Sequence, residues 1–130
     1  MKRALRSGFT LVELLTVIAI IALLAALILG LAGNAQKSAA RNKAEAEISQ
    51  LESFITDYQM KYGQVPLTVN ALSNALIEAK HSLTNFADPW GDPYNYSNSS
   101  KVTFYLWSRG GDLAPYTNRA IWIGNPAPLP

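Results

Sequence analysis

Residues 14–32 form an unbroken apolar run without one charged side chain. As a helix that rises about 1.5 Å per residue, the run spans roughly 28 Å, close to the thickness of the hydrocarbon core of a bilayer. A basic stub precedes it at residues 1–7, with the cations Lys2, Arg3 and Arg6. Because cytoplasmic flanks of membrane helices are rich in Lys and Arg, the sequence predicts one membrane helix whose N-terminus stays in the cytoplasm.

Glu13 stands at the start of the apolar run. An ionised carboxylate in lipid costs roughly 2.5 to 3.5 kcal/mol at mid-bilayer and less towards the interface, so Glu13 needs a nearby cation. If the chain is cut after Gly8, the new α-amino group of Phe9 lies about one helical turn away, on the same subunit or on a neighbour. We therefore expect the Glu13 carboxylate to pair with the Phe9 amine.

The same N-terminus is also compatible with a secretory signal or a plain membrane anchor. A secretory signal has a basic start and an apolar core, and residues 33–35 are small enough for its cleavage site, although a core of about 7 to 15 residues is shorter than this run. In a plain membrane anchor, the Glu13 side chain would extend to the interface between membrane and water. The mature N-terminus separates the three: Phe9 for a cut after Gly8, Gln36 or thereabouts for a secretory signal, Met1 for an uncut anchor.

The stretch GFTLVE at residues 8–13, behind a short basic leader, resembles the prepilin signal of the type IV pilin and pseudopilin superfamily. In that superfamily a membrane peptidase cleaves after the glycine and methylates the new N-terminal phenylalanine, and the glutamate guides docking of the helix into a filament. The resemblance therefore implies leader cleavage between Gly8 and Phe9, N-methylation of Phe9, and an assembly role for Glu13.

Composition excludes some functions. The chain has 130 residues, 11 Lys and Arg against 9 Asp and Glu, and no cysteine. Removal of the leader takes three of the cations, so the mature chain is about neutral and its bulk charge gives no support to nucleic-acid binding. Without a disulfide, an exported head of this size depends on packing, assembly or a bound ion for its stability.

We divide the chain into four parts: a leader at residues 1–8, a transmembrane and filament-core helix at 9–33, the amphipathic half of the same helix at 34–62, and a globular head at 63–130. If the two helical halves are coaxial, they make a rod of about 80 Å. This is the shape of a pilin.

The amphipathic half is rich in Ala, Lys, Glu and Gln, which favours helix. Apolar side chains recur at spacings of three and four and so share one face: Ile48, Leu51, Ile55, Tyr58 and Tyr62. Glycine weakens a helix interior, so we expect a soft spot around Gly30 and Gly33.

Gly63 and Pro66 are expected to end the long helix, because glycine suits a helix C-terminus and proline cannot continue one. A short helix is predicted at residues 69–80 with Thr68 as its cap. Its inward side chains should be Leu72, Ala75, Leu76 and Ala79. His81, the only histidine in the sequence, follows this helix and is interpreted as structural.

The sequence DPWG at residues 88–91 is a strong turn signal. It predicts a rigid turn leading into a strand at residues 94–96. Alternating side chains predict another strand at 101–108, and residues 120–123 are expected to form a returning strand. The predicted fold class is α+β: a long helix, one short helix, and an antiparallel sheet of two or three strands.

Enzymatic activity finds no support in the sequence. It has no paired nucleophile and base, no acidic cluster with metal spacing, and no glycine-rich phosphate loop before a helix. Asp88 and Asp92 are interpreted as turn formers, not as the carboxylate pair of a glycosidase. We expect a protein that is not an enzyme.

The turn at residues 88–94 and the helix exit at 63–66 resemble the major pseudopilin of type II secretion systems more than an adhesive pilin. Major pseudopilins hold the loop after the strand around a calcium ion with acidic side chains and backbone oxygens. The resemblance therefore raises the question of a calcium site in this chain.

In this chain Arg109 and Trp122 stand where that loop would carry acids. Asp112 remains as a weak metal candidate, with Asn118 and main-chain carbonyls to assist it. A single carboxylate makes a poor site for a doubly charged hard cation, so we expect no cofactor and no tight calcium binding. Arg109 is expected to donate hydrogen bonds to loop carbonyls in place of the ion.

The resemblance implies a structural subunit of a type II secretion pseudopilus, which polymerises and pushes folded proteins across the outer membrane. The implied partners are further copies of the chain, prepilin peptidase, the inner-membrane assembly platform, minor pseudopilins and the membrane itself. The precursor would cross the inner membrane once, with its head in the periplasm. Two alternatives stay open: a type IV pilus subunit for adhesion, motility or DNA uptake, and a membrane-anchored domain that binds glycans through aromatic side chains such as Trp107.

Overall fold

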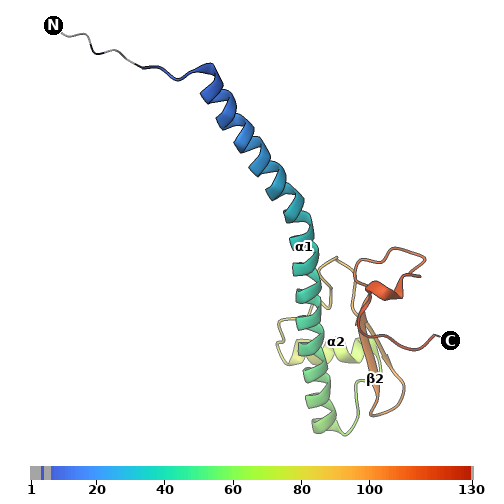
Figure 1. Cartoon of the computed structure of the whole chain (residues 1–130). Coiled ribbons are helices and arrows are strands. Elements are labelled where there is room, and N and C mark those ends of the chain that lie inside the picture. The colour runs from blue at the N-terminus through green and yellow to red at the C-terminus, as the bar shows by residue number, and fades with distance from the viewer. Residues whose placement is uncertain (1–3, 5–6, 130) are drawn as a thin grey trace. The chain divides into compact units, whose positions relative to one another are not determined.

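The computed structural model describes residue 4 and residues 7–129, so Lys2, Arg3 and Arg6 of the basic stub lie outside the described residues. The elements in chain order are α1 (Leu11–Tyr62), α2 (Val69–Glu78), β1 (Asn95–Asn98), β2 (Phe104–Ser108), the 3-10 helix η1 (Arg119–Ile121) and β3 (Ile123–Asn125). The chain divides into two units, Met1–Lys37 and Ser38–Pro130, and α1 contributes to both. The predicted α+β class is confirmed (Figure 1).

In the first unit, the apolar side chains of α1 face away from any protein core. Leu11 is 82% exposed, Leu24 is 52% exposed and Leu31 is 70% exposed. Among the described residues, α1 is the one helix with a stretch long and apolar enough to cross a membrane, and none of that stretch is buried. The helix is continuous through Gly30 and Gly33, so the soft spot expected there does not interrupt it.

In the second unit, the C-terminal part of α1 supplies one side of the hydrophobic core. Its buried side chains are Ala44, Ile48, Leu51 and Ile55. The predicted apolar face is therefore confirmed as far as Ile55, but it is wrong for Tyr62, which is 53% exposed. Tyr62 is the last helical residue, and its ring packs beside that of Tyr58 at a centroid distance of 4.4 Å instead of entering the core.

The predicted end of α1 is confirmed. Gly63 takes a φ of +73° and its N–H donates to the carbonyl of Gln59 at 2.8 Å, a left-handed cap that glycine adopts without strain. Val65 and Pro66 are then fully buried. The Val65 N–H donates to the Lys101 carbonyl at 2.8 Å, which fixes the helix exit against the segment between β1 and β2.

The predicted cap of α2 is confirmed, because Thr68 Oγ1 accepts from the Ala71 N–H at 3.1 Å. Leu72 and Leu76 are fully buried as expected. The helix ends at Glu78, not at residue 80, since Lys80 has a φ of +52° that no right-handed helix continues. The inward prediction for Ala79 is wrong: this residue is the C-terminal cap and is exposed.

The three strands form one antiparallel sheet in the order β1-β2-β3. Tyr96 pairs with Leu106, and Ser108 pairs with Ile123. The sheet and α2 lie beside the C-terminal part of α1 (Figure 1). Tyr94, Tyr96, Leu106 and Ile123 complete the buried core of this unit.

The strand boundaries differ from those predicted. β1 begins at Asn95 because the Tyr94 N–H still donates to Phe86 within the preceding turn, at 2.9 Å. β2 begins at Phe104 because residues 99–103 form the connection from β1, where the Ser99 N–H donates to the Thr103 carbonyl at 2.9 Å.

The returning strand is also displaced along the sequence. η1 occupies residues 119–121, which overlaps the predicted strand at 120–123, and β3 begins only at Ile123. Gly124 follows with a φ of +101°, and a Cβ on this residue would lie 2.5 Å from the Leu106 carbonyl oxygen. The third strand therefore forms where a glycine lets its backbone approach β2 closely.

Candidate functional site

The predicted cleavage position lies in exposed, irregular chain. Residues 7–10 have no regular secondary structure, Gly8 is exposed, and Phe9 is 93% exposed. The peptide bond between Gly8 and Phe9 is therefore not held in a helix or strand. Its backbone is accessible without unfolding α1, as a proteolytic site requires.

Thr10 and Glu13 form a reciprocal cap at the start of α1. The Thr10 N–H donates to Glu13 Oε2 at 2.9 Å, and the Glu13 N–H donates to Thr10 Oγ1 at 3.2 Å. This is a capping box, which satisfies two N–H groups that a helix start otherwise leaves unpaired. The role of Thr10 was not predicted, although the spacing Thr-x-x-Glu before an apolar run signals it.

The cap also fixes the Glu13 carboxylate close to Phe9. The N atom of Phe9 is three covalent bonds from the N atom of Thr10, which the carboxylate contacts directly. An amine formed at Phe9 by cleavage would therefore arise next to an anion that is already oriented. The Glu13 carboxylate can accept a hydrogen bond from that amine as well, since an ionised carboxylate accepts up to about four hydrogen bonds.

In the head, the turn at residues 88–92 is built on one buried carboxylate. Asp88 is 5% exposed, and its Oδ1 accepts from the N–H groups of Trp90 and Asp92 at 3.1 and 2.9 Å. Its Oδ2 accepts from the Ser108 hydroxyl at 2.6 Å. The interpretation of Asp88 as a turn former is confirmed, and the structure adds its link to the end of β2.

The loop between β2 and β3 is organised around Asp112, which is 8% exposed. Asp112 Oδ2 accepts from the Trp122 indole N–H at 2.9 Å and from the Asn118 N–H at 3.1 Å. Asp112 and Asn118, the residues considered for a metal site, thus do come together, but Asn118 acts as a hydrogen-bond donor to Asp112. The role of the Trp122 indole was not predicted.

The Trp122 ring interacts with a second indole and with a guanidinium. The ring stacks on that of Trp107 at 6.3 Å between centroids with an interplanar angle of 13°, and the Arg119 guanidinium lies 4.9 Å from the Trp122 ring centroid. Arg119 Nη2 donates to the Ala127 carbonyl at 2.7 Å. Arg119 therefore joins the C-terminal segment to the loop and also lies over the Trp122 indole.

The expectation that Arg109 donates to loop carbonyls is wrong. Its guanidinium carbon lies 3.9 Å from the centre of the Tyr116 ring, and its Nε is buried without a hydrogen-bond partner among the described residues. A planar, weakly hydrated guanidinium stacks well on an aromatic face, so this contact replaces the expected hydrogen bonds.

His81 takes a structural position, as interpreted from the sequence. Its Nδ1 accepts from the Leu83 N–H at 3.1 Å, and its ring forms a T-shaped pair with that of Phe54 at 5.4 Å between centroids. Within residue 4 and residues 7–129, no group of three or more His, Cys, Asp or Glu side chains is placed to hold a metal ion.

Two buried tyrosines, also not predicted, attach the sheet region to α1 and to the segment between α1 and α2. The Tyr94 hydroxyl donates to Glu47 Oε2 of α1, and burial followed by this hydrogen bond raises the pKa of Tyr94 well above its ordinary value. The Tyr96 hydroxyl donates to the Pro66 carbonyl. Burial, and then the nearby Tyr58, raise the pKa of Tyr96 to about 12.

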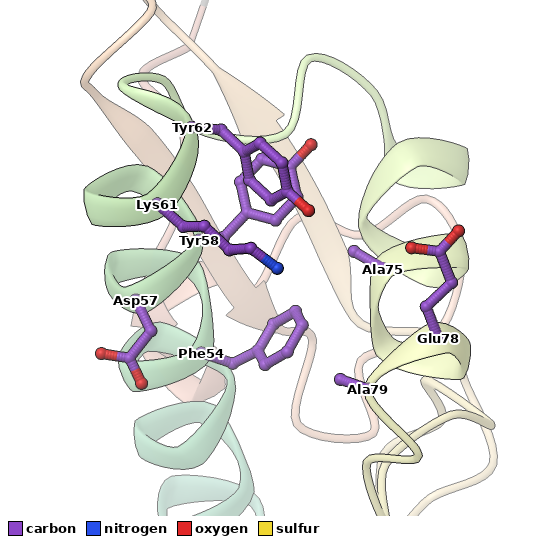
Figure 2. A pocket seen from close by; sticks show the side chains of 8 residues that line it. All are labelled: Phe54, Asp57, Tyr58, Lys61, Tyr62, Ala75, Glu78 and Ala79. Carbon is purple, nitrogen blue, oxygen red and sulfur yellow. The ribbon is translucent and has the colours of Figure 1, made fainter.

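A cleft of about 370 Å³ lies between α2 and the C-terminal part of α1. Figure 2 shows three aromatic rings and Lys61 extending from α1 towards Ala75 of α2 and the cap residue Ala79, while Asp57 points away. The residues that line the cleft are Phe54, Asp57, Tyr58, Lys61, Tyr62, Ala75, Glu78 and Ala79. They include no histidine, serine or threonine, so the lining offers no pairing of a hydroxyl nucleophile with an imidazole base.

Comparison with protein families gives two matches, one after the other along the chain. The family model described as "Prokaryotic N-terminal methylation motif" matches residues 3–29. The model described as "Type II secretion system (T2SS), protein G" matches residues 32–121. Together they cover the apolar segment and nearly all of the head.

Curated relatives carry the same description. The chain is 34% identical to a type II secretion system core protein G of Klebsiella michiganensis, over 93% of this chain and 94% of that protein. It is 33% identical to the core protein G of Escherichia coli K12, over 81% of both chains, and 29% identical to that of Pseudomonas aeruginosa, over 86% of this chain and 88% of that protein. No solved structure gives a significant match.

Proposed function

The chain belongs to the type II secretion system protein G family, and from this membership we propose that it is made as a precursor, cut between Gly8 and Phe9, and polymerised into a pseudopilus. The observation that carries the proposal is the succession of a methylation motif at residues 3–29 and a protein G domain at residues 32–121 in one chain. Neither the surface pilus nor the solitary binding domain has a comparable observation in its favour.

Processing would act on the exposed stretch before α1. The Gly8–Phe9 bond lies in irregular backbone, and the charge of the Phe9 amine would appear beside the oriented Glu13 carboxylate. N-methylation of Phe9 keeps a basic amine, so the pair of opposite charges survives the modification. A buried charge without a partner is strongly destabilising, and a neighbouring subunit's Phe9 amine would supply that partner in the filament.

Polymerisation would proceed through the apolar side of α1. Leu14, Ile21 and Ile28 are 62, 59 and 66% exposed, and no residue of the second unit is needed to form this surface. Such a surface is stable in lipid but not in water, where each large apolar side chain left exposed costs about 1.5 to 3 kcal/mol. Helix packing between copies of the chain would hide it once subunits leave the bilayer.

The proposed role is mechanical, and the subunit itself carries out no chemistry. The precursor would cross the inner membrane once, with the basic stub in the cytoplasm and the head in the periplasm. An assembly platform would add subunits to the base of the filament, with minor pseudopilins as further partners. The growing filament would push folded proteins across the outer membrane.

The proposal is tested by expressing the full chain in cells with prepilin peptidase and a type II assembly platform. Gly8→Val should leave the precursor uncut and abolish filaments seen by electron microscopy, because a branched side chain replaces the residue before the cut. Ser7→Ala, at the adjacent exposed position, is the matched control and should assemble normally. Filaments formed by uncut Gly8→Val chains would overturn the proposal.

A further inference from the structure

The loop of residues 109–122, which joins β2 to β3, is poor in the oxygen ligands that a calcium ion needs. It has one acid, Asp112, and two cations, Arg109 and Arg119. Calcium takes six to eight oxygen ligands, most of them carboxylates and carbonyls, at about 2.3 to 2.6 Å. Among the described residues, no three or more His, Cys, Asp or Glu side chains come together at this loop to hold a metal ion.

The Asp112 carboxylate is already engaged by protein donors. Oδ2 accepts from an indole N–H at 2.9 Å and from a backbone N–H at 3.1 Å, both within normal hydrogen-bond range. A hydrogen-bond donor aimed at a carboxylate oxygen occupies the place where a cation would approach. Trp122, which stands where an acid was expected, is itself one of these donors.

The same indole interacts with three side chains. Trp107 stacks on it, Arg119 lies over its ring, and its N–H reaches Asp112. Asp112, Asn118 and Trp122 bring the start and end of the loop together, as an ion would do by binding oxygens from both ends. Hydrogen-bond donors and stacked rings thus cross-link the two ends of the loop.

We propose that the loop of residues 109–122 is closed by the Asp112 carboxylate with the Trp122 indole and the Asn118 N–H, and that the head of this chain folds without calcium. The carboxylate acts as a hydrogen-bond acceptor and not as a metal ligand. The proposal concerns the head alone, and it is independent of cleavage and filament assembly.

The first arm of the test is calcium itself. The full chain is purified in detergent, and its melting temperature is followed by tryptophan fluorescence in millimolar CaCl₂ and in EGTA. The two values should agree, whereas an ion present at one hundred times its Kd would raise the melting temperature by roughly 10 to 20 °C. A calcium-dependent rise that disappears in Asp112→Asn would assign Asp112 as a metal ligand and overturn the proposal.

The second arm uses two matched tryptophan variants. Trp122→Phe keeps a ring in the stack but removes the N–H that reaches Asp112, and its melting temperature should fall by roughly 4 to 8 °C. Trp107→Phe alters the other ring of the same stack, but the indole N–H that it removes has no hydrogen-bond partner among the described residues. Its smaller effect should isolate the hydrogen bond. Equal melting temperatures for the two variants would also overturn the proposal.

Discussion

The hydroxyl of Ser108 donates to Oδ2 of Asp88 at 2.6 Å, and both side chains are almost completely buried. Ser108 ends β2, while Asp88 begins the turn that leads towards β1. Ser108 Oγ also accepts from the Gly110 N–H at 3.0 Å. One hydroxyl therefore links the turn, the central strand and the start of the loop between β2 and β3.

Removal of the Asp88 carboxylate should destabilise the head more than removal of its hydroxyl partner. Asp88→Ala loses three hydrogen bonds to a charged acceptor, leaves the buried Ser108 hydroxyl without its acceptor and frees two part-buried N–H donors, so we expect a loss of about 3 kcal/mol in the free energy of unfolding. Ser108→Ala should cost about 1 to 2 kcal/mol. Chemical denaturation of the detergent-solubilised chain measures both.

Asp57→Ala is the control for this comparison, because Asp57 is exposed on α1. It should change the free energy of unfolding by no more than about 0.5 kcal/mol. An Asp88→Ala variant as stable as this control would show that the buried carboxylate does not hold the turn.

Gly124→Ala should be among the most damaging single-methyl additions in the head. Gly124 has a φ of +101°, and a Cβ there would lie 2.5 Å from the Leu106 carbonyl oxygen, inside the sheet. Gly91→Ala is the matched control, since Gly91 also has a positive φ of +89° but its Cβ would meet open space. Gly91→Ala should cost about 1 to 2 kcal/mol, the usual penalty for a left-handed alanine.

The difference between these two variants isolates the close approach of β3 to β2. Thermal melts followed by circular dichroism should place Gly124→Ala several degrees below Gly91→Ala. Equal melting temperatures would mean that β3 does not pair with β2 as described.

Two buried tyrosines predict that the head loses stability in alkali. An unfolded tyrosine has a pKa of about 10, and folding raises the pKa of Tyr96 to about 12 and that of Tyr94 further. A raised pKa means that the folded state binds the proton more tightly. The contribution to stability is therefore complete below about pH 10 and is lost as the pH rises towards about 12.

Denaturation midpoints at a series of pH values, with tyrosine absorbance as a second probe, measure this loss. Tyr96→Phe should be less stable at neutral pH, because the Pro66 carbonyl loses its donor, but it should lose less stability between pH 10 and 12 than the unaltered chain. An identical alkaline loss in both proteins would contradict the assignment to Tyr96.

Glu13 has two roles that substitutions can separate. Glutamine at this position can still accept from the Thr10 N–H and so preserves the capping box, but it carries no charge. Glu13→Gln should therefore keep the start of α1, seen as slow amide exchange in detergent at residues 13 and 14, whose N–H groups donate to Thr10, yet assemble as poorly as Glu13→Ala. Full assembly of Glu13→Gln would show that the cap, and not the charge, is what assembly needs.

Patterns of local sequence predicted both helices, although not the last residue of α2 or the exposure of Tyr62 and Ala79. Spacing of apolar residues predicted the buried face of α1 through Ile55, Gly63 predicted its end, and Thr68 predicted the cap of α2. Each of these features depends on residues within a few positions of one another, so the sequence contains the whole of the signal.

The strand boundaries were less predictable because they depend on pairing between distant segments. β3 begins at Ile123 because Ser108 pairs with it, and the preceding residues form η1 to bring the chain into that register. The pairing of Trp122 with Asp112, and of Arg109 with Tyr116, also follows from the path of the folded loop. No spacing rule in the sequence marks these contacts.

The most direct test of the account is the intact mass and N-terminal sequence of the protein recovered from cells that carry a type II secretion system and prepilin peptidase. We predict a chain that begins at Phe9 and carries one added methyl group on its N-terminal amine. A chain that begins at Met1, or one that begins near Gln36 and so lacks the apolar segment, would contradict the account.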